Sequence, residues 1–460
     1  MLFNQISKFA WFGSAQHVDQ GRGMVPSDKS ALSRSSNRQL RVTVIIVMLS
    51  FLLILYIIIA HGGQQSLRYR GKVAVVYANP TFHEEVVSSI SCALHDMGYS
   101  VFIYVGSGLN ILGMTLPYSD VRKENSEKFY GKCISQWESL SYPAITSTIY
   151  HYVYKPDIMV FITYPMKLTG FILDGQALSI IKKLVEDKSN TPVVLVTHHP
   201  HDIINVFDPG DPVHSILPIN QTTFMFLGEH TEAQAQKMLK ENRTVHVDKD
   251  YVQQVKTKHL YPVLPLEYIP KANDGSDVLR QRPTFAMQGN FGGTHGYKKD
   301  PRGVVDCLRH IETNYTSDLS IDFIGHLLEP IEVGRLKNGD IRFLSGLDHP
   351  HFYAAIANAK FLVFGTTAES YFTTAASSSV PAALITHVPL VTSTKFLDLY
   401  PCLRDSKIHR LIARDLECDA MAAALSLTDD QYRQAKEEIH HCSDYFWNDA
   451  KIKLSSVISK

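Results

Sequence analysis

The chain has 460 residues, of which 45% are hydrophobic and 20% are charged. This composition is typical of a globular protein with room for two domains, and it excludes a largely disordered chain. Lysine plus arginine equal aspartate plus glutamate at 45 each, so the overall charge favours no nucleic-acid partner.

The N-terminal region predicts a membrane anchor. Residues 1–41 are rich in Ser, Gln and Arg and indicate a disordered tail. Residues 42–60 contain no charge over nineteen positions, the length of a membrane-spanning helix. A buried core helix would need a polar face, and a cleaved signal peptide would be shorter and closer to Met1. We expect a cytosolic tail, a transmembrane helix at 42–60 and a stem at 61–71.

Three glycosylation sequons and the cysteines favour a lumenal body. The sequons begin at Asn220, Asn242 and Asn314, all after the apolar stretch. The six cysteines lack CxxC spacing, which argues against a metal site or a dense disulfide framework, although one or two pairs can form in an oxidising lumen. These features predict a single-pass type II protein of the Golgi or endoplasmic reticulum membrane.

The first part of the body, residues 72–271, alternates strands and helices. Apolar runs bounded by turn residues predict strands, and apolar residues at helical spacing predict helices. The strands are expected at 72–78, 99–105, 158–163, 193–197 and 224–227, and the helices at 84–97, 172–186 and 232–240. This alternation is typical of a doubly wound α/β domain with a parallel sheet.

The pattern restarts after a polar, turn-rich linker at 272–282. The second domain, residues 283–460, opens with a strand at 284–287 and a glycine-bearing loop at 288–293. Further strands are expected at 321–324, 341–344 and 409–413, and helices at 351–359 and 429–458. The fold class is therefore α/β, with two tandem Rossmann-like units and a ligand cleft expected between them.

Residues 361–393 form the most informative stretch of the second unit. A strand at 361–364 leads into a loop with one carboxylate, Glu369. Three serines, Ser377, Ser378 and Ser379, precede a helix with Pro381 in its first turn, and a strand follows at 389–392. Open amides at a helix N-terminus favour an anion such as phosphate. An ordinary strand–loop–helix connection with capping serines explains the same pattern equally well.

Together, these features resemble the GT-B glycosyltransferases, which use nucleotide-sugar donors. The second unit is similar to the donor half of the group 1 (family 4) type. In that type a glycine-bearing loop meets the diphosphate, and residues 386–391 match its later Pro-containing strand. Parts of this half also resemble uncharacterised fungal proteins grouped with these enzymes. The resemblance implies a nucleotide-sugar donor, a glycan, lipid or protein acceptor, and no metal or other cofactor.

The resemblance also implies a donor site. Its residues would be Gly289, Asn290, Gly292, Gly293, Lys298, Arg302, Ser377, Ser378 and Ser379. A cationic side chain there would stabilise the departing diphosphate. The sequence does not distinguish Lys298 from Lys299 in this role. A solvated basic turn is the simpler explanation of the two lysines. The family's two glutamates fall at Thr374 and Ala382, which leaves Glu369 as the nearby carboxylate. A decayed, non-catalytic scaffold is the alternative.

A histidine-rich segment follows the strand at 193–197. His198 or His199 would contact the acceptor as a general base, with Asp202 orienting it. A capping role is the alternative, and zinc is disfavoured because adjacent histidines on one loop chelate poorly.

Two other enzyme classes fit the sequence less well. Residues 79–83 lack the glycines of a dinucleotide-binding loop, which argues against a dehydrogenase. A metal-dependent GT-A enzyme would explain the acidic 248–250 segment but not a second α/β unit.

Overall fold

The computed structural model divides the chain into two compact units, residues 1–68 and 69–460, which are described separately. The residues that it describes are 48, 50, 72–78, 84–106, 110–111, 114–115, 133, 136–140, 156–162, 190–201, 203, 218–241, 253–269, 283–291, 299–313, 318–327, 331–366 and 368–459. In the first unit these are Met48 and Ser50, both helical. The second unit contains every strand named below.

Several expectations for the N-terminal region lie outside the described residues. They are the tail at 1–41, the stem at 61–71 and, apart from Met48 and Ser50, the spanning helix at 42–60; the linker at 272–282 lies outside as well. Within the described part of the chain, no helix is both long enough and apolar enough to cross a membrane. The membrane span therefore stays a prediction.

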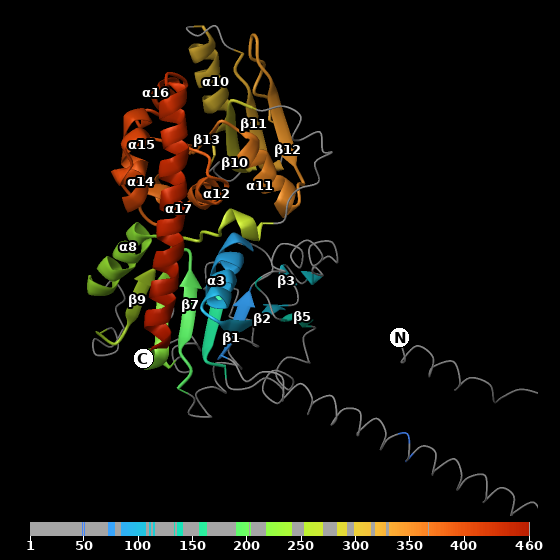
Figure 1. Cartoon of the computed structure of the whole chain (residues 1–460), viewed down its shortest axis with the longest axis vertical. Helices are drawn as coiled ribbons and strands as arrows, with labels where there is room; N and C mark the ends of the chain where they lie inside the picture. Colours follow the sequence, from blue (N-terminus) through green and yellow to red (C-terminus); the bar gives the residue numbers. More distant parts are fainter. Residues whose placement is uncertain are drawn as a thin grey trace, which may run out of the picture. The chain divides into compact units, whose positions relative to one another are not determined.

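The first sheet has seven parallel strands in the order β5-β2-β1-β6-β7-β8-β9 (Figure 1). Their bounds are β1 Lys72–Ala78, β2 Tyr99–Gly106, β5 Gln136–Leu140, β6 Ile158–Ile162, β7 Val193–Thr197, β8 Thr222–Phe226 and β9 Lys256–His259. A short antiparallel pair, β3 Asn110–Ile111 and β4 Met114–Thr115, lies outside this sheet. The predicted parallel sheet is confirmed, with β5 and β9 as strands that the sequence pattern missed.

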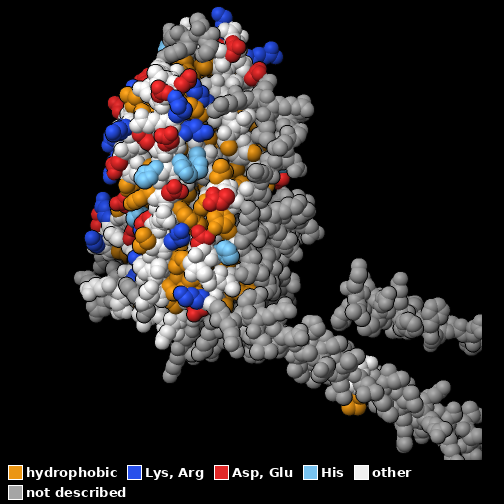
Figure 2. All heavy atoms as spheres, viewed as in Figure 1, with side chains coloured by type: hydrophobic (Ala, Val, Ile, Leu, Met, Phe, Trp, Pro, Cys, Tyr) orange, Lys and Arg blue, Asp and Glu red, His pale blue; other side chains and the backbone are white. Residues whose placement is uncertain are grey.

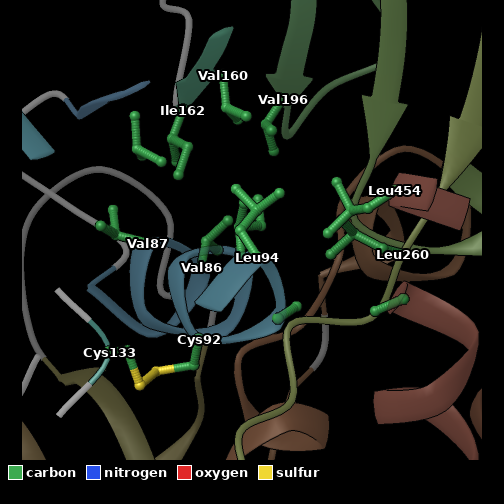
Figure 3. Packing of buried hydrophobic residues seen from close by; sticks show 14 of the residues in the cluster. Val86, Val87, Cys92, Leu94, Cys133, Val160, Ile162, Val196, Leu260 and Leu454 are labelled. Carbon is green, nitrogen blue, oxygen red and sulfur yellow. A yellow bond between two sulfur atoms is a disulfide. The ribbon is translucent and has the colours of Figure 1, made fainter. Parts of the chain in front are cut away.

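Helix α3, Glu84–Asp96, packs its apolar face on this sheet. Figure 3 shows Val86 and Leu94 of α3 with Val160 and Val196 of the sheet, all fully buried. Gly98 ends the helix at φ +85°, a conformation that glycine adopts without penalty. The other helices of this half are α8 Glu229–Lys240 and the 3₁₀ turns Ile219–Gln221 and Leu266–Tyr268.

The second sheet has five parallel strands in the order β12-β11-β10-β13-β14. Their bounds are β10 Phe285–Phe291, β11 Ile321–Leu327, β12 Ile341–Ser345, β13 Phe361–Val363 and β14 Leu390–Val391. The chain reverses its direction of strand addition between β10 and β13, and ligands of such sheets bind beyond the carboxyl ends of strands at this kind of switch point. The second α/β unit is confirmed.

Eight helices in the described residues belong to this half. They are α10 Pro301–Glu312, α11 His349–Asn358, α12 Ser379–Thr386, α13 Thr394–Leu397, α14 Pro401–Asp405, α15 Lys407–Ile412, α16 Glu417–Leu425 and α17 Asp429–Ile458. The strand predicted at 409–413 is wrong, because these residues lie mostly in α15. The side chain of Ser406 accepts the His409 amide and caps that helix, a local signal stronger than the short apolar run.

Helix α17 joins the two halves of the body. It begins at a capping box formed by Thr428 and Gln431. Its middle, including Ile439, packs in the core of the second half, whereas Trp447 and Leu454 pack in the core of the first (Figures 1 and 3). Burying a side chain such as Leu454 contributes roughly 1.5–3 kcal/mol, so this helix stabilises the arrangement of both sheets.

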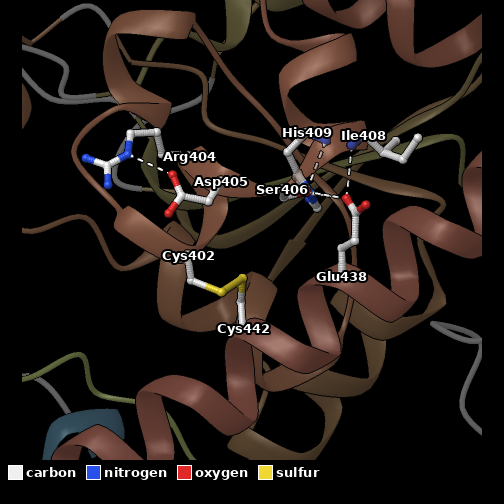
Figure 4. The surroundings of a disulfide bond; sticks show 8 residues. All are labelled: Cys402, Arg404, Asp405, Ser406, Ile408, His409, Glu438 and Cys442. Carbon is white, nitrogen blue, oxygen red and sulfur yellow. Dashed lines mark hydrogen bonds and ion pairs between the residues drawn. A yellow bond between two sulfur atoms is a disulfide. The ribbon is translucent and has the colours of Figure 1, made fainter.

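All six cysteines form disulfides, Cys92–Cys133, Cys307–Cys418 and Cys402–Cys442. The structure therefore contains more pairs than the one or two expected. The paired cysteines are 40, 41 and 111 residues apart in the sequence, and such separations do not indicate which cysteines pair. Beside Cys402–Cys442, the Ser406 hydroxyl donates to Glu438 and lies 2.7 Å from His409 Nδ1 (Figure 4). Burial lowers the pKa of His409 to about 4, so the ring is neutral.

The described surface carries both signs of charge. On the face in Figure 2, lysine and arginine side chains are interspersed with aspartate and glutamate, and histidines lie among them. Helix α17 carries ion pairs such as Arg433–Asp430 and Lys453–Asp449. This distribution agrees with the formal net charge of zero and offers no basic stripe for a nucleic acid on that face.

Candidate functional site

A cavity of about 150 Å³ lies where residues of the two halves meet. Its lining combines polar and aromatic side chains from both sides. The first half contributes Glu85, His198, His199, Leu227, Tyr261 and Pro262, and the second contributes Tyr371, Ala375, Ala376, Ser377, Ser378, Pro381 and Tyr400. The structure therefore brings the predicted histidines and two of the predicted serines into one site.

The histidines stand at the carboxyl end of β7, as expected. Thr197 donates its hydroxyl proton to the carbonyl of His199 at 3.0 Å and so holds the turn. His199 Nδ1 lies 3.4 Å from the Thr374 carbonyl of the other half, and as a donor in this contact it leaves Nε2 as the basic nitrogen. His201 is exposed and does not line the cavity. Asp202 lies outside the described residues.

The serines form the start of α12, so the predicted helix with Pro381 in its first turn is confirmed. Ser377 Oγ accepts the Ser379 amide at 3.2 Å. The side-chain amide of Gln288, at the end of the β10 core, donates to Ser378 Oγ at 2.9 Å and to Ser379 Oγ at 3.3 Å. These bonds fix the serine hydroxyls relative to the carboxyl end of β10.

A buried lysine lies behind the serines. Lys299 is 4% exposed and donates to the Phe364 carbonyl and, at 2.9 Å, to Ser379 Oγ. Its ammonium also lies 4.5 Å from the Phe364 ring centre. Burial lowers the pKa of Lys299 to about 7, although the negative charge of Glu417 opposes this. Burial likewise raises the pKa of Glu417 to about 7. Sequence reasoning left Lys298 and Lys299 undecided; the structure encloses Lys299.

The predicted glycine loop begins later than expected. Gly289 and Asn290 lie within β10, not after it. Gly289 has φ +151°, and a Cβ there would lie 3.0 Å from the Lys299 Cγ, so glycine lets the lysine pass against the strand. The remaining glycines, Gly292 and Gly293, and Lys298 lie outside the described residues. Arg302 is exposed on the first turn of α10.

Glu369 does not line the cavity. It lies in a 3₁₀ turn, Glu369–Phe372, where its exposed carboxylate pairs with Lys395 at 2.8 Å. The Lys395 ammonium also lies 4.5 Å from the centre of the Phe372 ring. The structure thus separates this carboxylate from the histidines and serines with which the sequence grouped it.

Sequence reasoning missed four lining residues with polar side chains: Glu85, Tyr261, Tyr371 and Tyr400. Glu85 stands in the first turn of α3, Tyr371 lies in the 3₁₀ turn Glu369–Phe372, and Tyr261 and Tyr400 lie outside the helices and strands. Tyr261 and Tyr400 contact each other, with ring centres 5.5 Å apart. The sequence signal for Glu85 was its place shortly after the first strand of a parallel sheet.

The sequence predicted three glycan sites and no metal site. Among the described residues, no group of three or more His, Cys, Asp or Glu side chains could hold a metal ion. Asn220 is exposed, next to the start of β8. Asn242 and Asn314 lie outside the described residues.

Comparisons with known proteins place the fold. No family model and no curated protein matches the chain. Among solved structures, a glycosyltransferase from Rickettsia africae ESF-5 is 11% identical with a TM-score of 0.50, covering 85% of this chain and 98% of the other. Anabaena HepE in complex with UDP is 10% identical, with a TM-score of 0.47 and coverages of 84% and 99%. The chain thus has the two-sheet α/β fold of the GT-B glycosyltransferases, as its sequence resemblance implied.

Proposed function

We propose that this protein is a glycosyltransferase that moves a sugar from a nucleotide-sugar donor to a glycan, lipid or protein acceptor. The cavity between the two halves carries the proposal. It joins His198 and His199 at the end of β7 to Ser377 and Ser378 at the start of α12. Two parallel sheets whose carboxyl ends contribute to one site are suited to a donor on one side and an acceptor on the other.

In the proposed reaction, an acceptor hydroxyl oxygen attacks the anomeric carbon of the donor sugar. The bond from that carbon to the phosphate oxygen breaks, and the nucleoside diphosphate leaves. His199 takes the acceptor proton, since its Nδ1 faces the Thr374 carbonyl and leaves Nε2 available. The leaving diphosphate would lie against Gly289–Gly293, Lys298, Arg302 and the α12 N-terminus, with its charge met by side chains and amides and not by a metal.

The proposed location is the lumen of the Golgi or endoplasmic reticulum, with a type II anchor at residues 42–60. Three observations support it: all six cysteines are paired, which is typical of an oxidising compartment, Asn220 is exposed, and residues 42–60 carry no charge. Digestion with an N-glycosidase should increase the gel mobility of the chain made in cells. An unchanged mobility would contradict the lumenal placement of the sequons.

Thermal denaturation of the purified full-length chain tests the donor site. A panel of nucleoside diphosphates and their sugars should contain one that raises the melting temperature, because a ligand at 100 times its Kd stabilises the folded state by about 2.7 kcal/mol. Arg302→Ala combined with Lys298→Ala should abolish the rise. Arg433→Ala, an exposed arginine on α17, serves as the control and should leave it unchanged.

A catalytically decayed scaffold is the second candidate. It is favoured by Glu369, which pairs with Lys395 and lies outside the cavity lining, and by Thr374 and Ala382 at the positions of the family's glutamates. In the enzyme, the proposed role of Glu369 in holding a donor hydroxyl would require release from Lys395. If no nucleotide shifts the melting temperature at millimolar concentration, the scaffold becomes the better account. Binding without sugar release would favour it as well.

A further inference from the structure

The two walls of the cavity differ in their hydrogen-bonding chemistry. The first half presents Glu85, His198 and His199, which include a carboxylate acceptor. The second half presents hydroxyls from Ser377, Ser378 and Tyr400, close to the N-terminus of α12. A ligand with an anionic end and a hydroxyl-bearing end would complement both walls, with its anionic end toward α12.

Tyr400 is the least satisfied polar group on this second wall. It is 1% exposed, and its hydroxyl proton has no acceptor among the described residues. The neighbouring His230 donates through Nε2 to the Ala375 carbonyl at 3.2 Å, and its Nδ1 makes no bond to the tyrosine. A buried donor without an acceptor is energetically unfavourable. The Tyr400 hydroxyl therefore indicates a place where a bound ligand supplies the acceptor.

The hydroxyl is held in place by its ring. The Tyr400 ring centre lies 5.1 Å from that of Phe396, 5.5 Å from that of Tyr261 and 5.7 Å from that of His230. Burial raises the pKa of Tyr400, an effect that the Ser377 amide partly offsets, so the hydroxyl keeps its proton at neutral pH. The Tyr400 hydroxyl is therefore a rigid hydrogen-bond donor at the cavity wall, beside the Ser377 amide.

We propose that the Tyr400 hydroxyl donates a hydrogen bond to an oxygen of the phosphate group that is attached to the sugar of the donor. This inference rests on the proposed function and adds a binding residue to it. A phosphate oxygen is the fitting acceptor, because the cavity wall that contains Tyr400 also contains the start of α12, where the helix dipole favours negative charge. The cavity supplies a phosphate site in which Tyr400 provides the hydroxyl donor.

The size of the cavity limits what it encloses. Pockets that bury a whole small ligand usually measure about 300–1,000 Å³, whereas this cavity measures about 150 Å³. It therefore encloses the reacting end of the donor, the phosphate and its sugar, while the nucleoside lies outside. With the phosphate at Tyr400, the hydroxyls of the sugar face Glu85 and the two histidines.

Tyr400→Phe is a selective test, because it keeps the ring contacts and removes only the hydroxyl, whose proton has no acceptor among the described residues. Binding of inorganic pyrophosphate and of uridine diphosphate to the full-length chain would be measured by calorimetry. The Kd should rise on the order of 10- to 100-fold in the variant, the range for a hydrogen bond to a charged group. The melting temperature without ligand should stay unchanged or rise.

The comparison variant is Tyr268→Phe, since the Tyr268 hydroxyl donates to Asp96 at 2.5 Å and the residue does not line the cavity. Its Kd for both probes should match that of the unaltered chain. Equal affinity of Tyr400→Phe and the unaltered chain, or an equal loss in both variants, would overturn the role of Tyr400 alone. Failure of the unaltered chain to bind pyrophosphate and every nucleoside diphosphate of the panel would overturn both this role and the proposed function.

Discussion

Replacing Lys299 with methionine should destabilise the folded chain by about 1–3 kcal/mol, the cost of leaving a buried polar group without its hydrogen-bond partner. The substitution removes the Lys299 charge, whose attraction lowers the pKa of the buried Glu417 carboxyl; that carboxyl accepts the Gly365 amide at 2.6 Å. It also removes the donor to Ser379 Oγ and to the Phe364 carbonyl. The loss would be measured as a lower midpoint of urea-induced unfolding.

Two further variants isolate the buried pair. Lys299→Met combined with Glu417→Gln should regain much of the lost stability, because the double variant has no uncompensated carboxylate. Lys337→Met, at an exposed position, should change the midpoint little. A similar small effect of Lys299→Met and Lys337→Met would show that the pair contributes nothing to stability.

Replacing His199 with alanine should lower kcat for sugar transfer by about 10²- to 10⁴-fold, the usual contribution of a general base. The side chain lines the cavity and is half-buried, and its Nδ1 lies 3.4 Å from the Thr374 carbonyl. The measurement is the initial rate of transfer from the nucleotide sugar that gives the largest thermal shift. Donor affinity should fall by less than kcat, since the proposed contacts to the donor phosphates lie on the opposite wall.

His201→Ala is the matched control for this experiment. His201 follows on the same segment after β7, but it is exposed and does not line the cavity. Its variant should keep the unaltered rate. Comparable rates for His199→Ala and His201→Ala would remove His199 from the proposed chemistry and leave His198 as the candidate base.

The strands and helices that the sequence predicted well are those with strong local signals. β1 and β7 are short, buried apolar runs, and α17 has a capping box followed by helical spacing over thirty residues. Buried parallel strands and long capped helices carry their pattern in neighbouring residues, so periodicity identifies them. The weak elements failed: β9 is polar, and 409–413 was too short to tell a strand from a helix.

The residues of the candidate site likewise fall into those that local sequence signals identified and those that they did not. The sequence by itself determined the two α/β units and placed His198, His199 and the serines at the ends of elements, since parallel strands direct their following loops to one edge. Only the tertiary structure brought Tyr400, Lys299 and Glu417 to that edge, and it moved Glu369 away. The physical reason is that burial and partnership depend on residues distant in the chain: Lys299 meets Ser379, eighty positions later, through the order of β10 and β13.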